Sequence, residues 1–200
     1  MNPTGPPKQF RAAPRWLAAA CDLHATLASE FSDPAGGFFR TPAQHEVLLA
    51  REKPLQDGAE PCGNSVAALT LLRLAAHTGD DDYRIQAEGI LRAAGSILEQ
   101  APQALGQMLL ALDWLDGSPR EVVILRPDGG DDSPLLAELQ KRFLPELAVV
   151  RAELSRADES ALARGRGLIA GKPAAYVCRQ GACGLPTSDP QELGRQLDQV

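Results

Sequence analysis

The chain has 200 residues, of which 44% are hydrophobic and 23% charged, and its formal net charge is −6. This composition can build a sizeable core, and the acidic balance argues against a nucleic-acid-binding protein, which would show a basic patch. No run of about 18 apolar residues is present, so no membrane span is expected.

A flexible leader at residues 1–13 is predicted to precede a helical region that ends at residue 117. The leader is polar and proline-rich and has no apolar segment of the kind found in signal peptides, so a cytoplasmic location is expected. Apolar residues recur every three or four positions over residues 15–31, which predicts the first helix. A short extended piece at residues 37–41 and a loop at residues 48–61 are expected to follow.

A buried helix is predicted over residues 66–77, because these residues are apolar on nearly all sides. Asn64 or Ser65 is expected to cap its first turn, and Gly79 is expected to end it in the way that glycine commonly ends helices. Two further helices, each with an apolar stripe, are predicted at residues 81–98 and 104–115.

The composition changes near residue 118, where a small α/β piece is predicted to begin. Continuous apolar runs predict buried strands at residues 121–125 and 147–150. A helix between them should start at Ser133, with Pro134 at the first helical position. Strand, helix and strand within about 30 residues form a βαβ unit with parallel strands.

The helix of this unit is expected to carry an apolar stripe, which consists of Leu135, Leu136, Leu139 and Phe143. A third strand is predicted at residues 174–178, and a final helix, capped by Asp189, should reach about residue 197. The sequence therefore predicts a mainly α chain with helical hairpins over residues 14–117 and an α/β subdomain over residues 118–200.

Several stretches of the chain match one family in order and spacing. They are Gly36-Gly37-Phe38-Phe39, the segment from Arg51 to Ala68, the segment from Arg73 to Asp80, the segment from Pro119 to Ile124, and the segment from Ala175 to Cys178 with Cys183, Pro186 and Asp189-Pro190. The chain thereby resembles the C-terminal end of the spermatogenesis-associated thioredoxin-domain proteins and their bacterial YyaL-type relatives. The resemblance covers about residues 15–198. Two departures are Cys62, which stands where the family usually has serine, and Glu60, which stands where an apolar residue is common.

The resemblance implies a thioredoxin-like domain followed by a six-hairpin (α/α) toroid, of which this chain would hold the last hairpins and the small α/β (βαβ) piece. Such toroids are similar to sugar epimerases and glycosidases, which implies a carbohydrate ligand in the funnel. The missing N-terminal thioredoxin-like and early toroid regions would act in cis or in trans. The alternative function is a non-catalytic scaffold domain that serves a thioredoxin-like redox domain. No cofactor and no metal are expected.

The candidate site residues precede or begin the buried helix: Lys53, Asp57, Asn64 and Ser65, with His45 in a neighbouring loop. Loops at helix starts face the funnel of a toroid, where these side chains could hydrogen-bond sugar hydroxyls. Asp57 would be the catalytic residue, as a general acid or base. The structural alternative is that Asp57 forms a turn and pairs with Lys53, while Asn64 caps a helix.

Cys178 and Cys183 are the redox candidates, and they could instead be two thiolate ligands of a metal. Zinc normally needs four ligands at tight spacing, and the chain has no CxxC motif, so the thiol exchange of a thioredoxin domain does not transfer to it. The alternative is that Cys178 packs as a small apolar residue at a strand end, with Cys183 in the following turn, because disulfides are rare in the cytosol.

Overall fold

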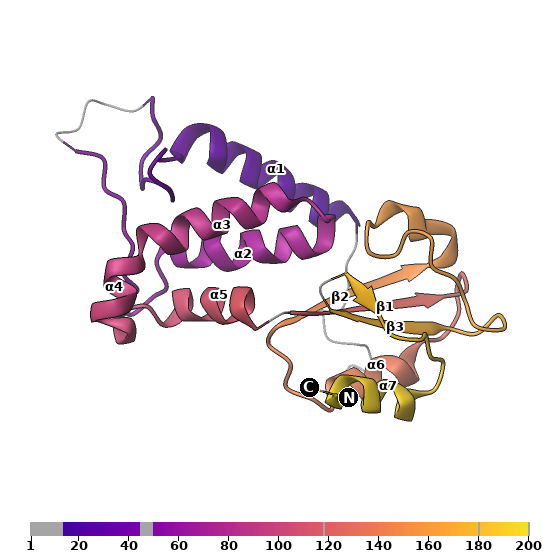
Figure 1. Cartoon of the computed structure of the whole chain (residues 1–200). Coiled ribbons are helices and arrows are strands. Elements are labelled where there is room, and N and C mark those ends of the chain that lie inside the picture. The colour runs from indigo at the N-terminus through magenta and orange to yellow at the C-terminus, as the bar shows by residue number, and fades with distance from the viewer. Residues whose placement is uncertain (1–13, 45–49, 118, 180, 200) are drawn as a thin grey trace, which may run out of the picture. The chain divides into compact units, whose positions relative to one another are not determined.

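The computed structural model describes residues 14–44, 50–117, 119–179 and 181–199. The chain forms two compact units, Leu17–Gly117 and a second that contains Ser118–Val200. The first unit is helical, and the second is a small sheet with helices (Figure 1). Across the described ranges, no helix combines the length and apolar character needed to cross a bilayer.

The helical elements in the described residues are α1 (Pro14–Phe31), α2 (Gly63–Thr78), α3 (Asp81–Ala93), α4 (Gly95–Gln100), the 3-10 turn η2 (Pro102–Ala104) and α5 (Gly106–Asp116). Helix α2 packs against both α3 and α5 (Figure 1). Its side chains Ala68, Leu71 and Leu72 are almost fully buried. The prediction of a buried helix is therefore confirmed, since α2 has neighbours on more than one side.

The ends of α2 confirm one predicted cap and correct the other. Gly79 takes the left-handed conformation, with φ 73°, and its N–H donates to Ala75 O over 2.8 Å, as predicted. The N-cap, however, is Cys62, whose Sγ accepts from the Ser65 N–H at 3.4 Å. Asn64 and Ser65 lie inside the first turn because the helix already begins at Gly63, so the predicted capping role was wrong.

The helix predicted over residues 81–98 is divided into α3 and α4. Ala94 ends α3, where its N–H donates to Ile90 O, and α4 starts at Gly95. Glycine has a low helix propensity, which accounts for the position of the break. The predicted apolar stripe is confirmed in α3, where Ala87, Ile90 and Leu91 are buried.

The second unit is a four-stranded sheet with the order β2-β1-β3-β4. Its elements are β1 (Arg120–Arg126), α6 (Ser133–Gln140), β2 (Leu147–Glu153), the 3-10 segment η3 (Leu154–Glu159), β3 (Ala174–Arg179), β4 (Ala182–Cys183) and α7 (Pro190–Asp198). Strands β1 and β2 are parallel, so the predicted βαβ unit is confirmed. Strand β3 runs antiparallel to both β1 and β4.

Alternate residues of the strands pack on opposite faces of the sheet, as the period of two requires. Val122 and Ile124 face a cluster that includes α6 and α7, whereas Val123 and Leu125 face Ala157 and the segment after it. The predicted stripe of α6 is confirmed for its three leucines, which are buried. Phe143 is 91% exposed, because α6 ends at Gln140 and the phenylalanine lies beyond the helix. Its predicted place in the core was wrong.

A mainly helical chain with a small α/β piece is therefore confirmed. The arrangement of α1 to α5 as part of a toroid stays a prediction.

Candidate functional site

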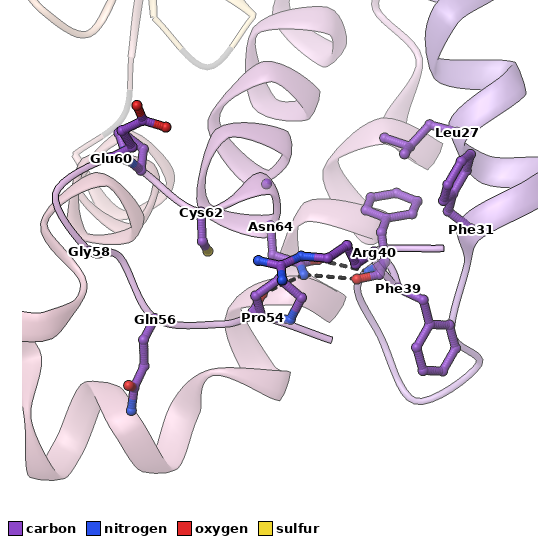
Figure 2. Close-up of a pocket in the computed structure, with 13 residues that line it drawn as sticks. Leu27, Phe31, Phe39, Arg40, Pro54, Gln56, Gly58, Glu60, Cys62 and Asn64 are labelled. Atoms are coloured by element: carbon purple, nitrogen blue, oxygen red, sulfur yellow. Dashed lines mark hydrogen bonds between the residues drawn. The ribbon is translucent and has the colours of Figure 1, made fainter. Parts of the chain in front are cut away.

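A pocket of about 610 Å³ lies beside the start of α2 in the helical unit (Figure 2). Its lining includes Phe31, Phe38, Phe39, Arg40, Gln56, Glu60, Cys62 and Asn64. Figure 2 shows Leu27 and Phe31 of α1 on one side and the loop through Gln56 and Gly58 on the other. The pocket is thus formed where the end of α1, the Phe38–Phe39 segment and the loop before α2 meet.

Asn64 is the predicted site residue that lies in the wall of this pocket, and it holds the wall together. Its Oδ1 accepts from the Phe38 N–H at 2.7 Å, and its Nδ2 donates to Phe38 O at 2.9 Å and to Pro54 O at 2.7 Å. The residue is 2% exposed. Through these three hydrogen bonds, the buried amide joins the start of α2 to the Phe38 segment and to the Pro54 segment. Its role is therefore structural, and we call this set of three bonds the Asn64 clamp.

The turn before Phe38 fits this clamp because it contains glycine. Gly36 and Gly37 have φ values of 96° and 83°, which L side chains rarely adopt. A Cβ on Gly37 would lie 2.8 Å from Asn64 Oδ1, and one on Gly36 would collide with the backbone of Gly89 in α3. The glycine pair therefore lets the chain approach both α2 and α3 closely.

Lys53 pairs with Asp33 instead of with Asp57, which corrects the predicted ion pair. Its Nζ donates to Asp33 Oδ2 at 2.7 Å and to Gly36 O at 3.0 Å. The hydrogen bond from Lys53, followed by the one from the Ala35 N–H, lowers the pKa of Asp33. Lys53 thus links the loop before α2 to the glycine turn. Its ammonium group forms its hydrogen bonds within the protein and not with a ligand.

Asp57 connects the starts of two helices. Its Oδ1 accepts from the Cys62 N–H at 2.8 Å, next to α2, and its Oδ2 accepts from the Gln107 N–H at 2.8 Å, in the first turn of α5. Burial alone would raise the pKa of Asp57, but hydrogen bonds from Cys62, Ser65 and the first turn of α5 together lower it. A general acid or base works best with a pKa near the working pH, so the geometry favours a structural role over the predicted catalytic one.

We expect Asp57→Asn to lower the free energy of unfolding by about 1–2 kcal/mol at neutral pH, because an amide accepts only one of the two bonds well and carries no charge for the helix N-termini. The folded-state pKa of Asp57 is depressed, so its contribution is present above the unfolded pKa of about 4 and is lost as the pH falls through the folded value. Urea unfolding from neutral pH down to about pH 2 should show the difference from wild type shrinking.

The matched control for Asp57 is Asp22→Asn, because Asp22 is exposed on α1. That variant should unfold like the wild type throughout the pH range. A deficit of Asp57→Asn that stays constant down to acid pH would contradict the role of the charged carboxylate.

Ser65 is fully buried within the protein, and His45 lies outside the described residues. The Oγ of Ser65 lies 3.1 Å from Cys62 Sγ, and Ser65 hydrogen-bonds Asp57. Gln56 and Glu60 are exposed at the pocket and make no side-chain hydrogen bond to the described residues. Sequence reasoning noted Glu60 as a departure from the family pattern but missed Gln56, which nothing in the local sequence distinguishes from an ordinary loop residue.

The redox candidates Cys178 and Cys183 form a disulfide. They are directly opposite each other in the β3–β4 pair, where facing side chains come close together. The alternative of two reduced, separately packed cysteines was therefore wrong, because it considered burial and cellular compartment but not the hairpin. Among the described residues, no group of three or more His, Cys, Asp or Glu side chains could hold a metal ion.

A helical unit followed by a small mixed sheet is the class of structure expected for the end of the family that the sequence motifs indicate. No family model matches the chain. It is 32% identical over 195 residues to spermatogenesis-associated protein 20 of Mus musculus, covering 92% of this chain. It is 33% identical over 191 residues to the Homo sapiens protein of that name, and 34% identical over 162 residues to an uncharacterized protein of Caenorhabditis elegans.

These relatives support the spermatogenesis-associated protein 20 family for this chain. The chain spans about a quarter of their length, 24% of both the mouse and the human protein.

Proposed function

We propose that the helical unit binds a small carbohydrate in the pocket beside α2. The observation that carries the proposal is that the pocket lining contains both aromatic rings and polar side chains that are not used in hydrogen bonds within the described chain. Gln56 and Glu60 are exposed at the pocket and make no side-chain hydrogen bond within the described part of the chain. A volume of about 610 Å³ is in the range of small-molecule sites.

The lining offers the two kinds of contact that a sugar needs. The partly exposed rings of Phe31 and Phe39 are apolar surfaces against which the C–H face of a pyranose could pack. The Gln56 amide both donates and accepts, and the Glu60 carboxylate accepts. Arg40 adds a guanidinium group, which pairs with Glu52 at 2.7 Å, and the side chains of both residues are 64% exposed. Such an exposed pair is weak, so the guanidinium is free to turn toward a ligand.

Binding is proposed in preference to processing of the sugar. The one predicted catalytic carboxylate, Asp57, has both oxygens bonded to backbone N–H groups. Glycoside hydrolysis uses two carboxyl groups about 5–9.5 Å apart across the scissile bond. Asp57 is not among the residues that line the pocket, and the described lining contains one carboxylate, that of Glu60. A pair would need a second group from elsewhere in a longer protein.

Exposed apolar side chains on the helices favour a second candidate, the non-catalytic scaffold. Leu23 is 72% exposed on α1, Ile85 52% on α3 and Leu110 50% on α5. The relatives are about four times as long as this chain. The additional hairpins and the thioredoxin-like domain implied by the family resemblance would cover these side chains. The cytoplasmic location of either function stays a prediction.

The test is a titration of the full chain with D-glucose, D-mannose and their methyl glycosides, followed by ligand-observed NMR and by calorimetry. We expect at least one sugar to bind with a dissociation constant in the millimolar range or below. The double variant Gln56→Ala/Glu60→Gln should weaken that binding by about tenfold or more, because each lost hydrogen bond to a ligand contributes roughly 1 kcal/mol.

The matched control is Gln100→Ala/Glu99→Gln, which makes the same two substitutions at exposed positions of α4. It should bind as the wild type does. If no sugar binds, or if both double variants bind equally well, the carbohydrate pocket is excluded and the scaffold is the better account.

A further inference from the structure

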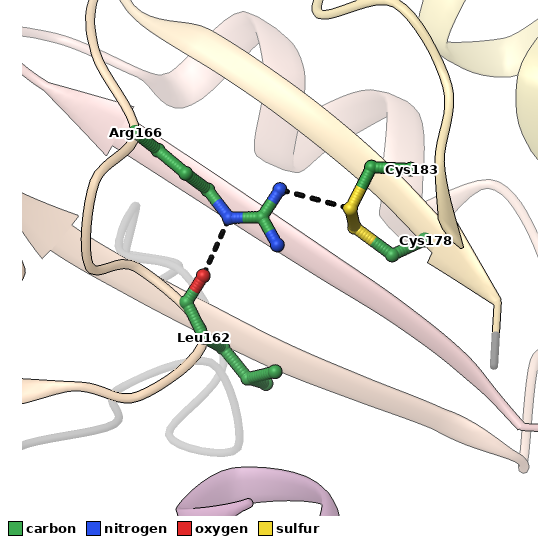
Figure 3. Close-up of a disulfide and its surroundings, with 4 residues drawn as sticks. All are labelled: Leu162, Arg166, Cys178 and Cys183. Atoms are coloured by element: carbon green, nitrogen blue, oxygen red, sulfur yellow. Dashed lines mark hydrogen bonds between the residues drawn. A yellow bond between two sulfur atoms is a disulfide. The ribbon is translucent and has the colours of Figure 1, made fainter. Parts of the chain in front are cut away.

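The disulfide between Cys178 and Cys183, drawn in Figure 3, has one buried and one accessible end. Cys178 lies in β3 and is 1% exposed, whereas Cys183 is exposed in the two-residue strand β4. A thiolate from solvent attacks the sulfur that it can reach. The geometry therefore directs an incoming thiolate to Cys183.

A guanidinium group is held against this accessible sulfur. Arg166 Nη1 donates to Cys183 Sγ at 3.1 Å, and its Nε donates to Leu162 O at 2.5 Å (Figure 3). Its Cζ lies 5.0 Å from the ring centroid of Tyr176. The phenol hydroxyl in turn is fixed by Gly167, donating to its carbonyl at 2.8 Å and accepting from its N–H at 3.0 Å. Arg166 is thus oriented from several sides.

Arg166 forms no ion pair with a carboxylate among the described residues. An arginine beside a cysteine favours the thiolate over the thiol, and the thiolate is the reactive form. In the reduced protein, this arrangement would make Cys183 the reactive cysteine.

From this geometry we propose that Cys178 and Cys183 are a thiol–disulfide exchange site that accepts electrons from a dithiol, with Cys183 as the reactive cysteine and Arg166 as its positioning residue. The proposal is independent of sugar binding, which concerns the helical unit alone.

The exchange balances in two steps. One thiolate of the dithiol attacks Cys183 Sγ, a mixed disulfide forms, and the Cys178–Cys183 bond breaks with its electron pair on Cys178 Sγ, which takes up a proton. The second thiolate of the dithiol then attacks the first sulfur of the same dithiol, which is bonded to Cys183 in the mixed disulfide. This releases Cys183 as a thiolate beside Arg166. The dithiol is oxidised to a disulfide, and the two cysteines are reduced by two electrons.

Glu121 is the carboxyl group to consider beside this site. It pairs in register with Cys178 on the neighbouring strand, so the two side chains share one face of the sheet. Burial raises the pKa of Glu121, and the charge of Arg166 opposes that rise. The groups that can influence a pH profile of Cys183 are therefore Arg166, Glu121 and the Tyr176 phenol.

The test uses the full chain in buffers with a series of ratios of reduced to oxidised dithiothreitol. After acid quenching and alkylation, peptide mass spectrometry reports each cysteine separately. We expect Cys178 and Cys183 to become labelled together in one two-electron transition, with the circular dichroism spectrum unchanged. In the reduced protein, Cys183 should react with iodoacetamide faster than Cys178.

The role of Arg166 is tested by the pH dependence of this alkylation. Arg166→Gln should slow labelling of Cys183 near pH 7 by about 3- to 10-fold and move the midpoint of its pH profile upward, because one unit of thiol pKa changes the thiolate fraction tenfold. Arg166→Lys, which keeps the charge, should recover part of the rate. Arg164→Gln is the matched control, since Arg164 is in the same loop and donates to Asp158 O instead of to sulfur.

Two outcomes would overturn the proposal. One is a disulfide that dithiothreitol reduces only after denaturant unfolds the protein. The other is an unchanged pH profile of Cys183 in both Arg166 variants, which would mean that exposure alone sets its reactivity.

Discussion

Replacing Arg151 by alanine is expected to lower the free energy of unfolding by about 3–5 kcal/mol, the largest effect of any single substitution considered for the α/β unit. Arg151 in β2 donates from Nε and Nη2 to the two carboxylate oxygens of Asp132, at 2.5 and 2.6 Å. The Asp132 side chain is only 1% exposed. Without the guanidinium, a buried carboxylate would be left with no counter-ion, and removing its charge from water is costly.

The surroundings of this pair explain why the carboxylate cannot simply turn toward water. Asp132 precedes α6, and its backbone carbonyl accepts from Leu135 and Leu136 at 3.1 Å. The residue is therefore fixed by the first turn of the helix. The hydrogen bonds that Arg151 donates to Asp132 are the main reason that the pKa of Arg151 is raised, although burial acts in the opposite direction.

The measurement is urea unfolding followed by far-UV circular dichroism, with Arg156→Ala as the matched control. Arg156 pairs with Glu159 at 2.7 Å, but both side chains are about half exposed. Exposed pairs contribute about 0–1 kcal/mol, so the control should unfold almost as the wild type does. A similar decrease in the free energy of unfolding for the two arginine variants would show that the buried Arg151–Asp132 pair contributes no more to stability than an exposed pair does.

The sequence predicted those elements whose formation depends on neighbouring residues. The apolar run at the first strand, the helix start at Ser133-Pro134 and the cap at Asp189 all act within a few positions of the element they define, and the structure confirms them. Gly79 belongs to this group, because a left-handed helix end favours glycine whatever lies further away. Binary pattern and capping rules were sufficient at these places.

The candidate site was less predictable because its bonds join residues far apart in the chain. Asn64 reaches Phe38 across 26 positions, and Asp57 reaches Gln107 across 50. Local preferences predicted that Asn64 caps a helix and that Asp57 forms a turn, and the family resemblance implied that both face a funnel. Their partners depend on how the loop before α2 packs, which no periodicity encodes. The pairing of Cys183 likewise depends on a short hairpin whose second strand has two residues.

Asn64 provides the second large effect: Asn64→Ala is expected to lower the free energy of unfolding by about 2–4 kcal/mol. The substitution removes three hydrogen bonds and leaves the N–H and carbonyl of Phe38 and the carbonyl of Pro54 without their partner. Buried backbone groups that lose their partner cost more than the bond itself contributed. Phe38 is 7% exposed, so water does not easily replace the amide.

Asn64→Asp separates the clamp from a simple volume effect. A carboxylate keeps the shape and can still accept from the Phe38 N–H, but it cannot donate to the two carbonyl oxygens, which it would repel. This variant should therefore also be destabilised, and less so at acid pH, where a protonated carboxyl can donate to one of them. Thr70→Ala, at an exposed position of the same helix, should change stability by no more than about 0.5 kcal/mol. An Asn64→Ala protein as stable as this control would show that the Phe38 segment is held by apolar packing, and that the pocket wall does not depend on the amide.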